Sequence, residues 1–157
     1  MTRTRGRAPR GARVAEAVPG GRWRTTTVMS AVRLSGPFAA ATLDGAVDAD
    51  AFRAYAAGVL APALRPGDVV VMDNLASHKA PGVRAAVEAA GARLVYLPPY
   101  SPDLNPIENM WSKVKAHLRA AAARTADALG AAIDAALAAV TPNDCAGFFR
   151  HCGYPAT

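Results

Sequence analysis

The spacing of hydrophobic positions along this 157-residue chain changes several times, and each spacing predicts a different kind of element. Two stretches rich in Thr, Val and small apolar residues, 23–34 and 38–43, predict strands. The second is closed by Asp44-Gly45, and the two strands are expected to form a hairpin. Residues 69–72 are continuously apolar, as in a strand buried on both faces of a parallel sheet. Residues 94–97 predict the next strand.

Between and after these strands the apolar residues return at helical spacing. Residues 50–64 predict a helix ended by Pro66-Gly67, and residues 81–90 predict one ended by Gly91. Further helices are predicted over 105–122 and 125–140. Strand and helix alternate, which predicts an α/β fold with right-handed crossovers.

Composition limits the class of protein. Hydrophobic residues make up 52% of the chain, enough for one domain with a core of its own. No uncharged apolar run approaches the length of about 18 residues that a membrane span needs, so no membrane association is expected. No apolar segment follows the N-terminal arginines, so no secretory signal is expected, and a cytoplasmic, nucleoid-associated location is predicted. Cys145 and Cys152 are expected to be free thiols.

The charge of the chain favours an anionic partner. The formal net charge is +6, and fifteen of the eighteen basic residues are arginines. Arginine binds phosphate through its bidentate guanidinium. Residues 1–13 carry five arginines and no acid, which predicts an extended basic arm. An alternative is that a GC-rich genome enriches arginine and alanine, so charge alone does not identify the partner.

Two acids stand where a metal site is expected. Asp73 directly follows the apolar run 69–72, and Glu108 opens the helix predicted over 105–122. Sites in open α/β sheets form beyond the carboxyl ends of the strands. Mg²⁺ prefers oxygen ligands and is often held by only one or two protein carboxylates, with water and phosphate completing its shell. The pair therefore indicates metal-dependent phosphodiester chemistry.

Each acid also has a structural interpretation. Asp73 can cap the turn that follows it through its side chain. Glu108 lies three residues after Asn105, with Pro106 between them, which is the spacing of a capping box. Both interpretations are compatible with metal binding, because a helix N-terminus favours a charged carboxylate.

The amino-acid sequences of the two segments resemble those of one family. MDNLASHK at 72–79 and LPPYSPDLNPIENMWSKVK at 97–115 are similar to the catalytic domain of bacterial insertion-sequence transposases of the Tc/mariner type, which are DDE superfamily endonucleases. The resemblance is most specific from Pro66 to Arg119 and extends more loosely over 5–154. It implies an RNase H-like (retroviral-integrase-type) mixed sheet with flanking helices over 14–157.

The resemblance also implies roles for particular residues. Asp73 and Glu108 would be catalytic metal ligands for Mg²⁺ or Mn²⁺ in a two-metal site, with Asn74 and His78 in support. The DNA-contacting residues would be Lys79, Lys113, Lys115 and Arg119. The implied activity is metal-dependent cleavage and strand transfer of DNA, at the ends of an element and at its target.

One part of the family's pattern is not found. The first of its three acids belongs to a central first strand, yet no Asp or Glu precedes Glu16, and RGRAPRG at 5–11 resembles the family's sequence just after that acid. The expectation is therefore a partial domain without its first central strand, inactive as an isolated fragment. Besides DNA, the candidate partners are the product of an upstream reading frame and a second copy of the chain. The alternative is a non-catalytic DNA-binding remnant of a transposase.

Overall fold

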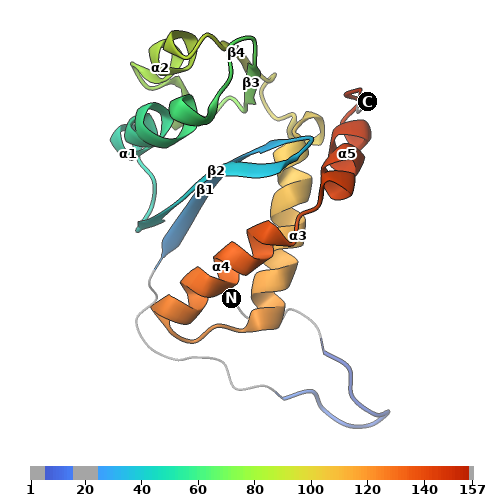
Figure 1. Cartoon of the computed structure of the whole chain (residues 1–157). Helices are drawn as coiled ribbons and strands as arrows, with labels where there is room; N and C mark the ends of the chain where they lie inside the picture. Colours follow the sequence, from blue (N-terminus) through green and yellow to red (C-terminus); the bar gives the residue numbers. More distant parts are fainter. Residues whose placement is uncertain (1–5, 16–24, 156–157) are drawn as a thin grey trace.

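The computed structural model of the chain describes residues 6–15 and 25–155. Residues 6–15 form no helix or strand and turn at Arg10-Gly11, where Ala12 N–H donates to the Pro9 carbonyl. The basic arm predicted over 1–13 lies partly outside the described residues. The other described residues form an α/β fold with small sheets and flanking helices (Figure 1).

The first two strands are an antiparallel hairpin, as predicted. β1 (Thr26–Arg33) pairs with β2 (Gly36–Asp44), and the register shifts by one residue between Met29 and Ala31. The extra residue is on β2, where Ala39 in the bulge has a φ of 50°, in the left-handed region. Trp23, which the sequence placed in the first strand, lies outside the described residues.

The second sheet is a βαβ unit. β3 (Val69–Met72) and β4 (Arg93–Tyr96) pair in parallel, joined through η3 (Ser77–Lys79) and α2 (Val83–Ala89). Gly67 and Gly91 precede these strands, and Gly67 N–H donates to the Gly91 carbonyl at 2.8 Å. A Cβ on Gly91 would lie 3.2 Å from the Cα of Pro66, and its φ is +77°. Glycine at 91 thus lets the two connections meet and starts both strands in register.

The helix predicted over 50–64 changes its geometry along its length. α1 (Ala49–Tyr55) continues as the π-helix η1 (Ala56–Leu60) and the 3₁₀ turn η2 (Ala61–Ala63). Pro62 has no N–H to donate, so a regular α-helical ladder cannot pass through it. The last three helices are α3 (Pro106–Ala121), α4 (Ala126–Ala138) and α5 (Pro142–His151). The sequence pattern did not predict α5.

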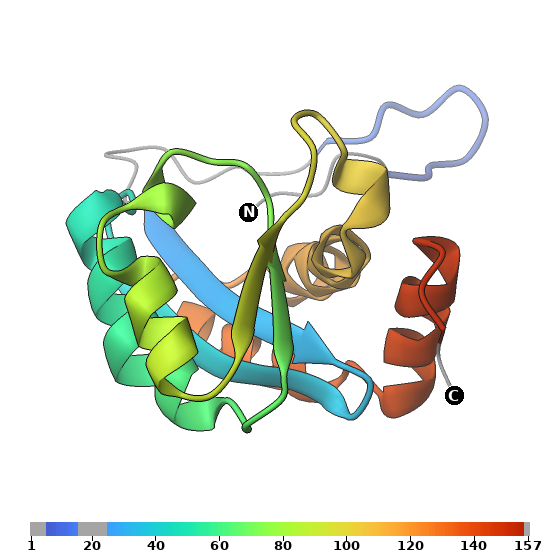
Figure 2. The same cartoon turned by 90° about the horizontal axis from the view of Figure 1, so that it is seen from above.

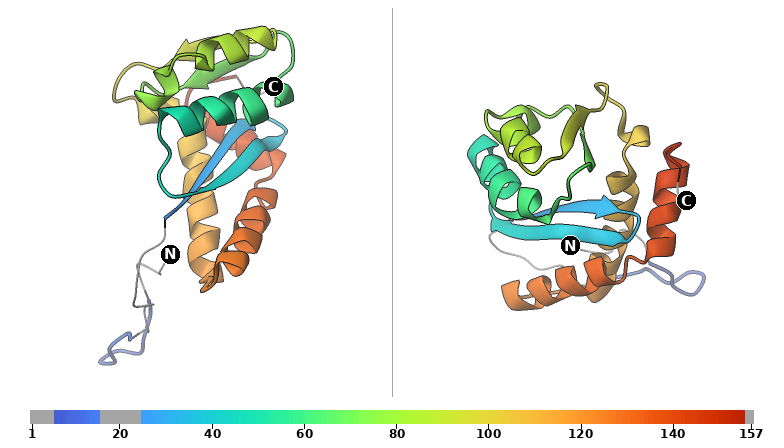
Figure 3. Two further views of the ribbon diagram at one scale, coloured as in Figure 1. Left: turned by 90° about the vertical axis from the view of Figure 1, so that its left-hand side faces the viewer. Right: turned by 45° about the horizontal axis from the view of Figure 1, so that its top comes forward.

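The hairpin lies between two hydrophobic cores (Figures 1 and 3). Met29 and Ala31 of β1 pack on the core built from α1, α2 and the β3–β4 pair, where Val83 and Val87 are fully buried. Val28 and Val32 point to the opposite face, as strand alternation requires, and pack on the core of α3, α4 and α5. Each fully buried valine contributes about 1.5–3 kcal/mol of hydrophobic stabilisation.

The strands do not join into one sheet among the described residues, which form two sheets of two strands each. Every residue of β1 is only partly buried. One edge of β1 and one edge of β3 are therefore open to hydrogen bonding with a further strand.

Candidate metal and nucleic-acid site

The parallel pairing of β3 and β4 brings two connecting segments to the same end of the sheet. Met72 lies opposite Tyr96, and Leu97 N–H extends the pairing to the Met72 carbonyl at 2.8 Å. Asp73 therefore leaves β3 where the proline-rich segment leaves β4. That segment leads through η4 (Pro102–Leu104) into α3 (Figure 2).

Asp73 is held by its own loop. Its Oδ1 accepts a hydrogen bond from Leu75 N–H at 3.2 Å and lies 2.5 Å from Nδ1 of His78. Its side chain is 39% exposed, and Oδ2 makes no hydrogen bond or ion pair with the described residues. The turn-capping role is thus present, and it leaves one carboxylate oxygen open to a ligand.

His78 is fixed on three sides. Its ring lies on that of Phe52 with the centroids 4.3 Å apart, its carbonyl accepts from the Tyr96 hydroxyl at 2.9 Å, and Nδ1 faces Asp73. The Nδ1–Oδ1 contact is close, but it is not aligned as a hydrogen bond, and the buried Nδ1 has no other partner among the described residues.

Asn74 gives a second buried polar atom beside Asp73. Its Oδ1 is buried and accepts no hydrogen bond within the described part of the chain. Buried polar atoms are nearly always satisfied by protein, water or an ion. The loop after β3 therefore carries an unsatisfied oxygen on Asn74, the residue next to Asp73, while His78 Nδ1 faces Asp73 Oδ1.

Glu108 lies in the first turn of α3 with its carboxylate unengaged. Asn105 is the N-cap, its Oδ1 accepting from Ile107 N–H at 3.4 Å, and Pro106 is the first helical residue. Glu108 is exposed and makes no side-chain hydrogen bond or ion pair with the described residues. The reciprocal bond of a capping box is absent from α3, so that interpretation of Glu108 is wrong.

The structure groups Asp73, Asn74 and His78, and it delivers Glu108 on the segment that leaves the neighbouring strand. No hydrogen bond or ion pair joins Glu108 to Asp73. Over residues 6–15 and 25–155, no three His, Cys, Asp or Glu side chains are grouped so as to hold a metal ion. The described residues thus do not bring Asp73, His78 and Glu108 together into one metal-binding group.

The basic residues expected to contact DNA differ in their exposure and in the contacts that they make within the chain. Lys113 is half-buried and ion-paired with Asp144 of α5. This contact and the hydrogen bonds from Thr141 hold the pKa of Asp144 well below its usual range. Lys79 is exposed, with its Nζ 5.9 Å from the centre of the Tyr96 ring. Lys115 and Arg119 lie one turn apart on α3, Lys115 exposed and Arg119 half-buried.

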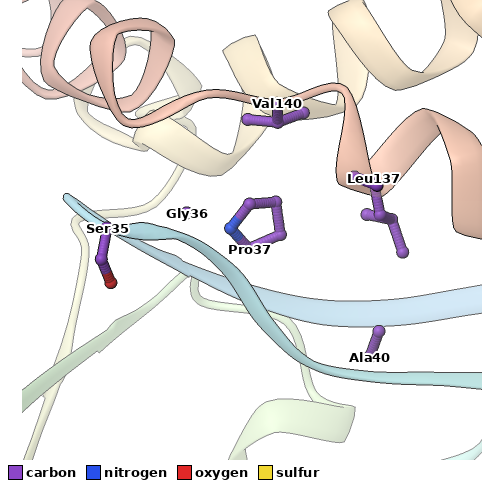
Figure 4. A pocket seen from close by; sticks show the side chains of 7 residues that line it. Ser35, Gly36, Pro37, Ala40, Leu137 and Val140 are labelled. Carbon is purple, nitrogen blue, oxygen red and sulfur yellow. The ribbon is translucent and has the colours of Figure 1, made fainter.

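A hollow elsewhere on the surface has no part in this site. It lies between the turn of the hairpin and the end of α4 (Figure 4). No charged residue lines it; the lining residues are Ser35, Gly36, Pro37, Ala40, Leu137, Ala138 and Val140. It lacks groups for binding a metal or phosphate.

The sequence pattern missed the contacts that α5 makes with α3. Tyr154 and Cys152, at the end of α5, bond to Leu104 and Asn109 near Glu108. The sequence did contain a signal for the start of α5. It is Thr141-Pro142-Asn143-Asp144, which forms a capping box there.

Comparison with known proteins identifies the family of the chain. A family model described as DDE superfamily endonuclease matches residues 1–130. No curated protein matches the chain. Among the described residues, no helix combines the length and the apolar character that crossing a membrane requires.

Proposed function

Because the chain belongs to the DDE superfamily endonucleases, we propose that it is catalytic-domain sequence of an insertion-sequence transposase of the Tc/mariner type. The reaction would be metal-dependent cleavage of DNA at the ends of the element, followed by attack of the freed 3′-hydroxyl on target DNA. The observation that carries the proposal is Asp73 at the carboxyl end of β3, fixed by His78 and keeping one open oxygen.

The donor atoms suit Mg²⁺ or Mn²⁺. Asp73 Oδ2 and the Glu108 carboxylate are oxygen ligands without partners in the described chain, and the unsatisfied Asn74 Oδ1 is a third oxygen beside Asp73. When bound, the metal would supply the Lewis acidity that phosphodiester hydrolysis needs. Asp73 and Glu108 would hold it, and His78 would keep Asp73 in position.

The two small sheets support an RNase H-like arrangement. A two-stranded sheet is marginally stable alone, and β1 and β3 each have an open edge. We propose that a further strand, outside the described residues, pairs between β1 and β3 and joins the two pairs into one mixed sheet. A carboxylate at the end of that strand would supply the third acid of the family's metal-binding set.

A second candidate function is a DNA-binding remnant without catalysis. The described residues contain no group of three His, Cys, Asp or Glu side chains that could hold a metal ion, and this favours it. The sequence immediately upstream of the reading frame separates the two candidates. A frame that encodes a strand ending in Asp supports the catalytic one, and a region interrupted by stop codons supports the remnant.

The test of the proposal is a calorimetric titration of the full chain with Mn²⁺. Wild type should bind weakly, and Asp73→Asn and Glu108→Gln should each lose binding, because each removes a charged oxygen ligand. The matched controls are Asp134→Asn on α4 and Glu88→Gln on α2, both at exposed positions outside the site. Unchanged Mn²⁺ binding in both Asp73→Asn and Glu108→Gln would remove these carboxylates from the metal site.

A further inference from the structure

The C-terminal segment of the chain contacts the turn that carries Glu108 on both sides. The Tyr154 hydroxyl donates to the Leu104 carbonyl at 2.9 Å, four residues before Glu108. Asn109 Nδ2, one residue after Glu108, donates to Sγ of Cys152 at 3.6 Å. One helical turn further along α3, Lys113 pairs with Asp144. Glu108 itself makes no such contact, so its neighbours fix its place.

The segment that makes these contacts is held by hydrogen bonds and a ring contact of its own. The N–H of Tyr154 donates to the Phe149 carbonyl and that of Gly153 to the Arg150 carbonyl, with a φ of 82° at Gly153. This is the Schellman pattern, which ends a helix in one defined geometry. The Phe149 and Tyr154 rings meet edge to face at 6.0 Å.

α5 is anchored at its other end as well. Thr141 and Asp144 form a capping box, and Cys145 is fully buried in the core shared with α3 and α4. Figure 3 shows α5 running beside α3. The segment Cys152–Tyr154 is therefore presented to α3 from a fixed support, and α5 lies beyond residues 1–130, which the family model matches.

The first turn of a helix frays more readily than its middle, because it is held by fewer hydrogen bonds within the helix, so contacts from outside help to fix it. A metal ligand must also be held to about 0.5 Å to bind well. We propose that Cys152–Tyr154 is a clamp that positions Glu108 for metal binding, with Asn109 and Tyr154 as its positioning residues. This rests on the proposed function, in which Glu108 is a metal ligand.

The test uses the full chain with the double substitution Asn109→Ala and Tyr154→Phe, which removes both clamp contacts and leaves the packing of α5 in place. The matched control is Asn143→Ala with Tyr100→Phe, two exposed positions whose side chains make no hydrogen bond within the described residues. Hydrogen exchange is followed by mass spectrometry over residues 101–110 and, for comparison, 126–138. Mn²⁺ affinity is measured by electron paramagnetic resonance.

The clamp predicts exchange that is several-fold faster over 101–110 and unchanged over 126–138. It also predicts Mn²⁺ binding weaker by roughly 3- to 10-fold, the loss expected from one or two net hydrogen bonds. Unchanged exchange over 101–110 overturns the clamp. Faster exchange with unchanged Mn²⁺ affinity also overturns it, because the segment would then fasten the helix without positioning the ligand. Failure of the proposed function is separate, since it shows as unchanged binding in Glu108→Gln with the clamp intact.

Discussion

At the scale of single residues, Asp73 has a structural role in its loop and keeps one carboxylate oxygen available for a ligand. One of its oxygens accepts from Leu75 N–H and faces His78, while the other has no partner in the described chain. The first oxygen fixes the side chain, so it does not have to be ordered when a ligand arrives. A carboxylate held in this way binds a cation with less loss of conformational entropy than a free one.

Tyr55 is the residue whose environment most clearly sets a pH dependence. Its hydroxyl donates to the carbonyl of Ala39 at the hairpin bulge, at 2.9 Å. Burial raises its pKa from 10.0 to about 12, because the phenolate would be desolvated. The folded pKa is above the unfolded one, so this contribution to stability is complete below pH 10.0 and is lost as pH rises through about 12.

Tyr55→Phe should therefore lower the free energy of unfolding by about 1 kcal/mol at neutral pH, since the partly buried Ala39 carbonyl loses its donor. The stability difference between wild type and Tyr55→Phe should shrink above pH 10.0, because the Tyr55 phenol of the unfolded wild-type chain then ionises while that of the folded chain does not. Urea unfolding at pH 8, 10 and about 11.5 measures it, with Tyr100→Phe, at a fully exposed position, as the control. A difference that stays constant over this range would contradict the account.

At the scale of elements, sequence patterns predicted what short-range chemistry determines. The apolar run Val69–Met72 predicted β3, with Asp73 directly after its end. Asn105-Pro106 predicted where α3 begins. The helix predicted over 50–64 did not remain regular, because Pro62 interrupts its hydrogen bonds. The helix α5 was missed because it is short and its cap uses Asp144 where a typical capping box has Glu or Gln.

The contacts between elements could not be predicted in the same way. The division of the strands into two pairs, the pairing of Lys113 with Asp144 and the bond from Tyr154 to Leu104 join residues far apart in the sequence. No local pattern encodes them. Whether Glu108 closes a capping box was likewise decided only by the observed hydrogen bond from Ile107 N–H to Asn105, which leaves the Glu108 side chain free.

The pairing of α3 with α5 predicts a dependence on acid. Lys113, with Thr141, lowers the pKa of Asp144 in the folded state, so the stability that Asp144 contributes is present above its unfolded pKa of 3.8. It is lost as pH falls below that value towards the folded pKa. Asp144→Asn should be less stable than wild type at pH 7, and the difference should narrow at pH 3.

Urea unfolding at pH 7, 5 and 3 checks this prediction, with the exposed Asp134→Asn as the control. A difference between wild type and Asp144→Asn that is the same at all three pH values would show that the pair with Lys113 is not responsible.

At the scale of the whole molecule, the hairpin is a layer between two hydrophobic cores that are built from different residues. One core supports the β3–β4 pair and Asp73, and the other supports α3 and Glu108. The two acids therefore belong to different halves of the fold. Their relative position depends on the hairpin and on whatever completes the sheet beside β1, which is why the proposed additional strand matters for activity.

The net charge of +6 predicts how the molecule binds DNA. Binding should be non-specific and steeply salt-dependent, because basic side chains contact phosphate and release counterions. Arg119→Gln should lower the slope of log affinity against log salt by about 1. Arg53→Gln should not change it, since Arg53 lies on α1 and is ion-paired with Asp50. Fluorescence anisotropy with duplexes of unrelated sequence measures both, and strong discrimination between these sequences would contradict the prediction.

The central claim is that Asp73 and Glu108 are the acids of a metal-dependent nuclease site that a further strand completes. The most direct measurement is Mg²⁺-dependent nicking of a DNA carrying the element's end, by the 157-residue chain and by the chain extended with the upstream reading frame. We predict that only the extended protein nicks, and that Asp73→Asn or Glu108→Gln in it abolishes nicking. Nicking by the extended protein that survives both substitutions would contradict the account.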